Sequence, residues 1–265
     1  MTKLQSEQVY PTDLTDDQWA VLQPLLPKQS GPGKPATIDK RRIVNSMLYL
    51  LRTGCQWRAL PKDLPAWGAV RYYFDKWSQD GTLERINDTL REMERQRQGR
   101  EAQPSAAIVD SQSVKTTEVG GIKGFDAGKK VKGRKRQLLV DTLGLLMRVS
   151  VHAADISDAV GGEFVLVDLG RLAERLTKLF ADQAYQGLVE WVKAEYGLEL
   201  EIVAKAKDQK GFVVLPQRWK VERSIAWLCR NRRLSKDYEY HNECSEAMIY
   251  LASIHLLIKR LAKTA

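Results

Sequence analysis

Residues 218–233 are the stretch from which the fold is worked out, and they read Arg218-Trp219-Lys220-Val221-Glu222-Arg223-Ser224-Ile225-Ala226-Trp227-Leu228-Cys229-Arg230-Asn231-Arg232-Arg233. At 3.6 residues per turn, the apolar side chains fall on one side of a helix, and a charged set with Arg218, Glu222 and Arg230 falls on another. Glu222 is the single acid among many bases. A solvated i, i+4 salt bridge explains it, but so does a metal-binding acid among phosphate-binding arginines. The second interpretation requires partner carboxylates from elsewhere in the chain.

The composition is that of a globular protein with a basic balance. Of 265 residues, 43% are hydrophobic, enough for one large or two small domains. The net charge of +9 favours a polyanionic partner, because each Lys or Arg that neutralises a phosphate releases a condensed counterion. No run approaches the ~18 apolar residues that span a bilayer, and the N-terminus lacks the order of a signal peptide. We therefore expect a cytoplasmic protein with no membrane partner.

Cysteine and histidine give no sign of a metal cage. The three residues of each type are scattered, without C-x-x-C spacing, so neither a disulfide framework nor a zinc site is expected.

The first hundred residues predict four short helices. The first begins at a capping box, with Thr15 as N-cap and Gln18 three residues on, and runs to about Pro27. The others are expected from Asp39 to Gly54, from about Ala66 to Gln79, and from Thr82 onward.

These helices form the first of two predicted domains. Short helices with tight turns resemble a helix-turn-helix module, in which Arg71 and Lys76 would contact DNA phosphates. A helical subdomain that only packs on the rest of the chain fits equally well. The apolar periodicity ends before Pro104. We therefore divide the chain into an all-α, helix-turn-helix-like domain at 1–103 and a second domain at 104–265.

The second domain alternates strands and helices. Strands are predicted at 106–114, 136–142, 146–152, 177–182 and 198–203, and helices at 155–176, 188–196, 218–233 and 246–263. This order is that of the RNase H-like fold, an α/β architecture with a mixed sheet and helices on both faces. The last helix is apolar on one face, so it would dock either on the core of this chain or on a second subunit.

Acids lie on two of the predicted strands. Asp110 is inside the first strand, where an unpartnered carboxylate would be costly to bury, and Asp182 ends the fourth. In the RNase H-like order these strands end side by side at the sheet centre, and Glu222 follows on the next helix. Turn or capping roles explain three competing acids, Asp141, Asp155 and Asp158.

The stretch from Lys115 to Gln137 is rich in glycine and basic residues, and it is predicted to be a flexible loop. A charge run is most often a solvated segment. Because this charged stretch follows directly after the strand of Asp110, we interpret it as a loop that binds DNA phosphates at the edge of the site. The candidate DNA-binding residues of this loop and of the Glu222 helix are Lys115, Lys129, Lys130, Lys132, Arg134, Lys135, Arg218, Arg223 and Arg230.

Three carboxylates at one place suit phosphodiester chemistry. Two Mg²⁺ ions roughly 3.5–4 Å apart activate the attacking oxygen and stabilise the leaving oxygen. Mg²⁺ prefers hard oxygen ligands and keeps several waters, so a cage of His or Cys is not required. The expected cofactor is therefore Mg²⁺, for which Mn²⁺ would substitute, with Asp110, Asp182 and Glu222 as the hypothetical ligands.

Four segments of the second domain resemble those of bacterial insertion-sequence transposases of the DDE type. They are Ile108–Thr117, Asp126–Arg136, Ala181–Tyr185 and Trp219–Leu228. Two segments of the first domain, Leu14–Trp19 and Cys55–Pro61, resemble the same group. Together they cover nearly the whole chain.

The resemblance implies an enzyme that nicks DNA at the inverted-repeat ends of an element and joins the freed 3′-hydroxyl to a target strand. Asp110, Asp182 and Glu222 would be its catalytic, metal-binding residues. Its partners would be the terminal inverted repeats and target DNA, in the nucleoid. A homodimer or higher assembly is expected, because two ends must be brought together.

Around the glutamate, related transposases carry Tyr-x2-Arg-x3-Glu-x6-Lys. Arg218 and Glu222 match this pattern, whereas Leu215 and Cys229 stand for the Tyr and the Lys, and Arg230 lies one residue beyond. Two alternatives share the fold. One is a DNA-binding derivative that has lost catalysis, and the other is a nuclease directed to a DNA structure.

Overall fold

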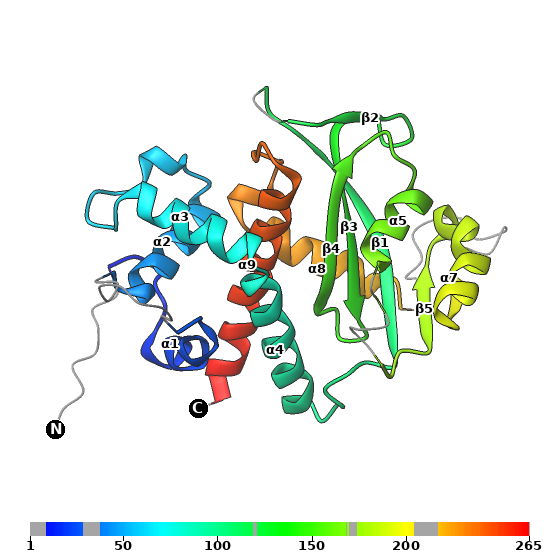
Figure 1. Cartoon of the computed structure of the whole chain (residues 1–265), viewed down its shortest axis with the longest axis horizontal. Coiled ribbons are helices and arrows are strands. Elements are labelled where there is room, and N and C mark those ends of the chain that lie inside the picture. Colours follow the sequence, from blue (N-terminus) through cyan, green and yellow to red (C-terminus); the bar gives the residue numbers. More distant parts are fainter. Residues whose placement is uncertain are drawn as a thin grey trace.

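The computed structural model describes residues 9–28, 38–118, 121–167, 169, 174–203 and 217–264. A group of helices occupies one end of the molecule and a sheet with its own helices occupies the other (Figure 1). The helices are α1 (Asp16–Leu22), α2 (Lys40–Thr53), α3 (Trp67–Gln79), α4 (Thr82–Arg97) and α9 (Asn242–Leu261). The predicted helical N-terminal region is confirmed.

Local signals in the sequence fix these helix ends. Thr15 and Gln18 form the predicted capping box of α1, since each side chain accepts a hydrogen bond from the other's backbone N–H. A short 3₁₀ turn, Gln23–Leu25, follows α1. Asp39 caps α2, and Gly54 ends it in the left-handed conformation at φ 73°, which glycine adopts without a steric cost.

Among the described residues, six strands form one mixed sheet. They are β1 (Ala106–Lys115), β2 (Gly124–Asp126), β3 (Val131–Asp141), β4 (Leu146–Ala153), β5 (Lys178–Ala181) and β6 (Glu199–Ile202). The order is β2-β3-β1-β5-β6, with β4 also paired to β3. The pairs β1–β3, β2–β3 and β3–β4 are antiparallel, whereas β5 runs parallel to both β1 and β6.

Each face of the sheet has its own apolar core. On one face, Ile108, Leu138 and Val140 pack against α8 (Trp219–Cys229) and α9. On the other, Val109 and Leu139 pack with α5 (Asp158–Leu166) and α7 (Val189–Tyr196). This arrangement confirms the predicted α/β architecture with helices on both faces.

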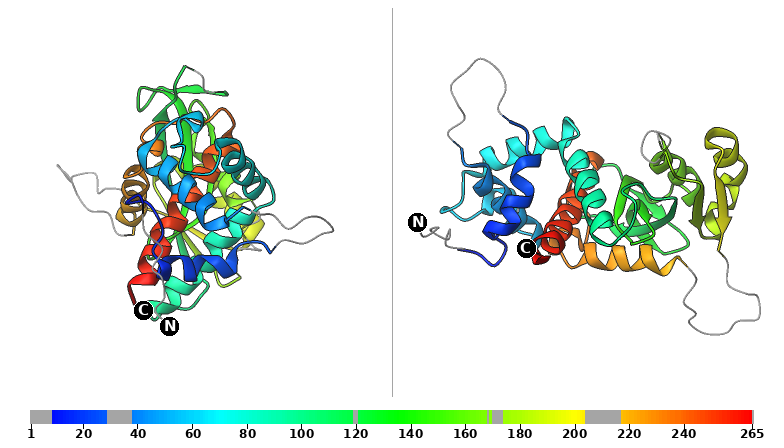
Figure 2. Two further views of the ribbon diagram at one scale, coloured as in Figure 1. Left: turned by 90° about the vertical axis from the view of Figure 1, so that its left-hand side faces the viewer. Right: turned by 90° about the horizontal axis from the view of Figure 1, so that it is seen from below.

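Helix α9 joins the two halves of the molecule. Its buried side chains belong to the same apolar core as those of α1, α2, α3 and α4 and one face of the sheet. Figure 2 shows α9, in red, between the N-terminal helices and the sheet. The predicted tail helix therefore docks within this chain. No helix in the described part of the chain has the length and apolar character to span a membrane.

Several boundaries differ from the predictions. The stretch predicted as a flexible loop, Lys115 to Gln137, contains β2 and the first part of β3, which pairs with β2, β1 and β4. Helix α5 begins after its cap Ser157 and ends at Leu166, and residues 168 and 170–173 of the helix predicted to 176 lie outside the described residues. Helix α9 begins four residues before the predicted 246. Helix α4 continues to Arg97, because Arg91, Glu94 and Arg95 are buried polar residues that an apolar pattern does not register.

Candidate active site

Asp110 lies in the middle of β1 at the centre of the sheet. It is buried and pairs across the antiparallel ladder with Leu138 of β3. Side chains alternate along a strand, so Asp110 shares the face of Ile108, which is the face covered by α8 and α9. The prediction of an acid inside the first strand is confirmed, and it points toward the Glu222 helix.

Asp182 follows the last residue of β5. Its backbone is extended, and its Oδ1 accepts a hydrogen bond from Ala184 N at 2.9 Å, so it caps the 3₁₀ helix Gln183–Leu188. The other oxygen, Oδ2, accepts a hydrogen bond from Arg218 Nη2 at 3.4 Å. The register of the parallel pair, in which Ile108 lies opposite Phe180, places Asp182 beside Asp110.

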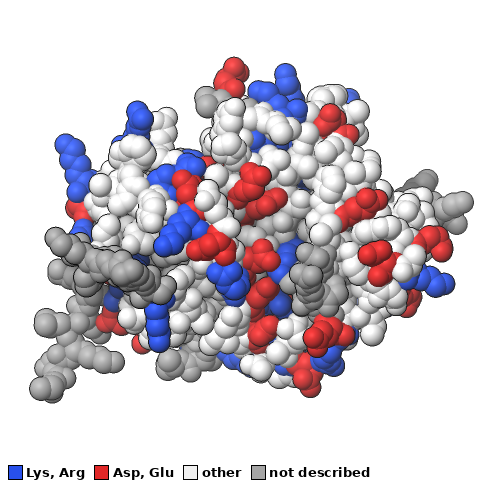
Figure 3. Space-filling model, viewed as in Figure 1, with Lys and Arg blue, Asp and Glu red and all other residues white. Residues whose placement is uncertain are grey.

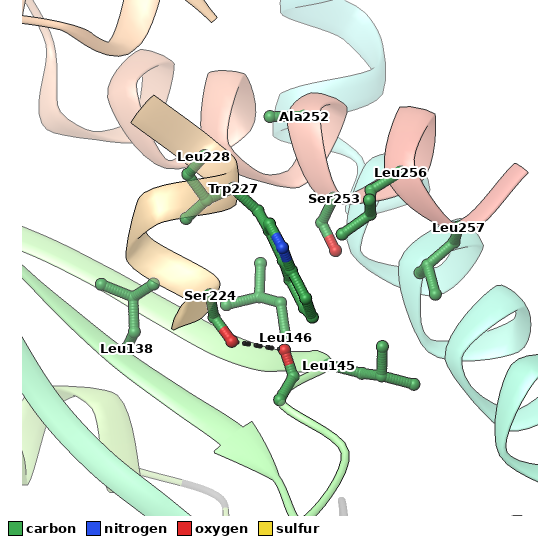
Figure 4. Close-up of a pocket in the computed structure, with 11 residues that line it drawn as sticks. Leu138, Leu145, Leu146, Ser224, Trp227, Leu228, Ala252, Ser253, Leu256 and Leu257 are labelled. Atoms are coloured by element: carbon green, nitrogen blue, oxygen red, sulfur yellow. Dashed lines mark hydrogen bonds between the residues drawn. The ribbon is translucent and has the colours of Figure 1, made fainter. Parts of the chain in front are cut away.

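Glu222 lies in the first turn of α8, with its side chain 53% exposed. The helix is fixed to the sheet by the buried Val221 and Leu228 and by Ser224, whose Oγ donates to Gly144 O at 2.6 Å in the β3–β4 turn. Figure 4 shows this bond beside a small apolar pocket lined by residues of α8, α9 and the turn. Glu222 is thus the accessible acid on a firmly held helix.

Arg218 brings the three acids together. Its Nη2 atom lies 3.5 Å from Oδ2 of Asp110, 3.4 Å from Oδ2 of Asp182 and 4.0 Å from Oε1 of Glu222. The predicted i, i+4 pair of Arg218 and Glu222 is therefore present. It is also the longest of three contacts made by one nitrogen. The acids of β1, β5 and α8 converge on a single positive charge.

The pKa of Asp110 is raised above the value of an exposed aspartate, so its neutral form is favoured. Burial raises the pKa of its carboxyl, and the nearby Asp182 carboxylate acts in the same direction. The Ser111 backbone N–H, which donates to Oδ1 at 2.7 Å, and the charges of Arg218 and Lys129 lower the pKa. A bound cation would favour the ionised carboxylate further.

A buried hydrogen-bonded chain supports the loop that carries Asp182. The Tyr185 hydroxyl donates to Oε1 of Gln137 on β3 at 2.5 Å, and Gln137 Nε2 lies 3.3 Å from His152 Nε2 on β4. Burial raises the pKa of Tyr185 well above its usual range, so the hydroxyl stays a neutral donor. Sequence reasoning assigned no role to Tyr185, although it lies in the transposase-like segment Ala181–Tyr185.

Some of the predicted DNA-binding residues are exposed. They are Lys76, Lys115, Lys129, Lys130, Lys132 and Arg230. On the face shown in Figure 3, a group of Lys and Arg side chains lies at the top of the molecule with acidic side chains beside it, and elsewhere the two charges are interspersed. Lys129 also reaches the strand that carries Asp110, since its Nζ donates to Ser111 Oγ at 3.2 Å.

Two other predicted DNA-binding residues, Arg134 and Lys135, form ion pairs inside the protein. Arg134 is fully buried and paired with Asp237 at 3.1 Å, and Lys135 is buried and paired with Asp158 at 3.2 Å. Both belong to strand β3 and not to a loop, because the sheet extends further than the glycine content suggested. Their bonds hold the sheet to its neighbours and leave them little access to a phosphate.

Two further predicted DNA-binding residues, Arg71 and Arg223, lie over aromatic rings. Arg71 forms an ion pair with Asp75 at 2.7 Å and lies over the Trp57 ring. Arg223 lies between the rings of Trp219 and Trp227, 4.5 Å and 4.6 Å from their centroids.

Two of the competing acids, Asp141 and Asp158, lie at a turn and at a helix start as predicted. Asp141 Oδ1 accepts the N–H groups of Leu143 and Leu145 in the β3–β4 turn. Asp158 is the first residue of α5, although Ser157 is its cap. Of the residues that depart from the transposase pattern, Cys229 is exposed and accepts a bond from Gln112 at 3.2 Å, and Leu215 lies outside the described residues.

The donor set suits a hard divalent cation. Asp110, Asp182 and Glu222 offer carboxylate oxygens, the ligands Mg²⁺ prefers, and all three already face one cationic group. In the described part of the chain, no three Asp, Glu, His or Cys side chains are close enough to hold an ion without rearrangement. The chemistry of the three carboxylates fits a metal, and Arg218 is the cationic group that lies among them.

Comparison with known proteins agrees with this geometry. Residues 101–257 match the family described as “Transposase DDE domain”, and residues 14–87 match “Putative transposase of IS4/5 family”. An insertion element IS402 uncharacterized 16.2 kDa protein of Burkholderia cepacia is 26% identical over 114 residues, covering 40% of this chain and 76% of the relative. The uncharacterized protein y4sN of Sinorhizobium fredii is 26% identical over 102 residues, covering 38% of this chain and 75% of the relative.

The first match spans more than half of the chain and confirms the predicted RNase H-like fold. Its coverage includes all three acids and the helix α8 that carries Glu222. The chain therefore belongs to the DDE transposase family, whose members act on DNA.

Proposed function

We propose that this chain is a divalent-metal-dependent DNA transposase that cleaves one strand at each inverted-repeat end of its element and joins the freed 3′-hydroxyl to target DNA. The observation that carries the proposal is the convergence of Asp110, Asp182 and Glu222 on Nη2 of Arg218. The middle of β1, the end of the adjacent strand β5 and the helix α8 supply these three carboxylates.

The three carboxylates would hold Mg²⁺, or Mn²⁺ in its place. When bound, the ions supply activation of the attacking oxygen and charge stabilisation at the leaving 3′-oxygen. The chain itself sets the geometry. Asp110 is held by the sheet, Asp182 by its bond to Ala184 N, and Glu222 by the packing of α8.

The exposed lysines around β2 would bind the DNA backbone. Lys129 and Lys130 lie in the β2–β3 turn, and Lys132 lies at the start of β3. The bond from Lys129 to Ser111, the neighbour of Asp110, ties this turn to the catalytic strand. Phosphates bound here would position the duplex without reading its sequence. A dimer or higher assembly would bring two such ends together.

The test is strand cleavage of duplex DNA that carries the ends flanking the gene, with Mg²⁺ or with EDTA, for the wild type beside Glu222→Gln. Glu222 is half exposed, so the substitution should leave the fold intact. Metal-dependent nicks at the ends that are lost in the variant support the proposal. Equal cutting of DNA without the ends would indicate a structure-directed nuclease, and binding without cleavage by folded wild type would indicate an inactive derivative.

A further inference from the structure

The guanidinium of Arg218 occupies the point that a cation would need. We propose that Arg218 is the resident counter-ion of the metal site: it neutralises the three carboxylates until a divalent cation replaces it, and it then pairs with a phosphate of the bound DNA. This inference rests on the proposed function, since it takes Asp110, Asp182 and Glu222 as the metal ligands.

The contacts of Arg218 are those of a loosely held ion. One nitrogen serves three carboxylates at 3.4 to 4.0 Å. Elsewhere in the chain, Arg95 lies 2.6 Å from Asp141, and Arg233 lies 2.7 Å from Glu239. Charge-assisted bonds of that shorter kind are directional and strong. Arg218 therefore balances charge at the site without a strong bond to any one acid.

A metal ion and the guanidinium cannot share this position. Mg²⁺ lies about 2.1 Å from each carboxylate oxygen that it binds. Both Asp110 and Asp182 face Arg218 through the Oδ2 atom, so an ion on these oxygens would stand close to a like charge. The repulsion is strong inside a partly buried site. Cation entry thus requires Arg218 to move away.

A DNA phosphate is the partner that would accept the displaced side chain. Nε of Arg218 is buried and has no hydrogen-bond partner in the described part of the chain, so the side chain gains bonds by moving. Arginine binds phosphate in a two-pronged geometry. DNA would then draw Arg218 from the carboxylates and raise metal affinity. By linkage, metal would raise DNA affinity by the same factor.

The experiment measures Mg²⁺ binding by calorimetry in the full chain, with and without a duplex that ends at the cleavage point and carries a 3′-dideoxy terminus. No strand can be cut or joined, so the readout is independent of activity. Without DNA, Arg218→Gln should bind Mg²⁺ about tenfold more tightly than wild type. DNA should raise the wild-type affinity by about tenfold and that of the variant by less than about twofold.

Controls separate charge, fold and site. Arg218→Lys keeps the charge and should stay near wild type, and Arg232→Gln removes an exposed charge elsewhere and should leave Mg²⁺ affinity unchanged. Circular dichroism confirms that each variant is folded. If folded Arg218→Gln binds Mg²⁺ no more tightly than wild type while Asp182→Asn loses binding, only the counter-ion role is wrong. If Asp182→Asn still binds Mg²⁺ normally, the metal site of the proposed function fails as well.

Discussion

Asp110 and Asp182 stand side by side because each lies two residues beyond Ile108 and Phe180, which pair across the parallel strands β1 and β5. Side chains two residues apart along a strand share a face, so Asp110 lies on the face of Ile108 and Asp182 on that of Phe180. Both carboxylates therefore project from the face that α8 covers. A shift of one residue in this register would send one of them to the opposite face. The register of two short strands thus decides whether the site exists.

Replacement of Asp182 by Asn should abolish cleavage and spare the fold. Asn caps helices as well as Asp does, so the bond to Ala184 N is retained. Cleavage should fall by more than about a hundredfold, since even indirect partners of metal ligands contribute tenfold to hundredfold. The measurement is end cleavage beside DNA binding by fluorescence anisotropy. An unfolded Asp182→Asn protein would instead show that Asp182 is a structural residue.

Lys130 and Lys135 offer a matched pair of substitutions, because the first is exposed and the second is buried. Lys130 is exposed in the β2–β3 turn at φ 53°, a conformation that Asn tolerates, so Lys130→Asn removes one charge and keeps the turn. DNA binding should weaken, and the slope of log affinity against log salt should fall by about 0.9. An unchanged slope would place the β2–β3 turn outside the DNA path.

The buried member of that pair, Lys135, should respond differently. Its Nζ bonds to Ile156 O at 2.8 Å and pairs with Asp158 at 3.2 Å. Lys135→Gln should lower the free energy of unfolding, because it removes the charged partner of the partly buried Asp158 carboxylate. The slope of log affinity against log salt for the folded variant should stay as in wild type. Urea unfolding and DNA titration across salt concentrations measure the two effects.

The ion pair of Arg95 and Asp141 connects α4 to the sheet. Both side chains are buried, and Nη1 lies 2.6 Å from Oδ2. Arg95→Met should lower the free energy of unfolding by about 3–5 kcal/mol, because Asp141 would remain as a buried, unpaired charge. Adding Asp141→Asn should recover part of the loss. Urea unfolding checks both, and equal stability of Arg95→Met and wild type would contradict the role of the pair.

Glu246 of α9 should make folding stability depend on pH. Burial raises the pKa of its carboxyl to about 7 from 4.5, against the opposing hydrogen bond that Val151 N donates at 2.7 Å. The folded state holds the proton more tightly than the unfolded state, so the contribution of this group is complete below pH 4.5 and is lost as pH rises through 7.

Glu246→Gln keeps the acceptor oxygen and removes the titration. Relative to wild type, the variant should gain roughly 2 kcal/mol in the free energy of unfolding between pH 5 and pH 8. Urea unfolding at the two pH values provides the test. A difference between variant and wild type that does not change with pH would show that Glu246 does not titrate in this range.

Much of this protein could be predicted from local sequence patterns. The capping box at Thr15, the glycine that ends α2 and the apolar spacing of the helices are decided by neighbouring residues, and the structure confirms them. The strand and helix order of the second half likewise predicted the fold, because few architectures accommodate that order. The three acids were selected because they lie on the first strand, at the end of the fourth predicted strand and on the following helix. Their metal-binding role stays a prediction.

Other features depend on contacts between distant segments. The glycines and bases of 115–137 predicted a loop, but Arg134 and Lys135 are strand residues because β3 pairs with β1 and β4. Asp237 and Asp158 pair with their charges. Ion pairs such as that of Arg95 with Asp141 are invisible to an apolar pattern, since a charged residue is predicted to be exposed until its partner is known.

The sequence by itself determined most of the elements, their order and the choice of the three acids, because helix and strand signals act over a few neighbouring residues; β2 and the start of β3 are the exceptions. Only the tertiary structure decided that α9 forms the core of the N-terminal helices and that Arg218 faces all three carboxylates. Those relationships join residues as far apart as 110 and 218. They are set by the register of β1 with β5 and by the packing of α8 on the sheet, which no local pattern specifies.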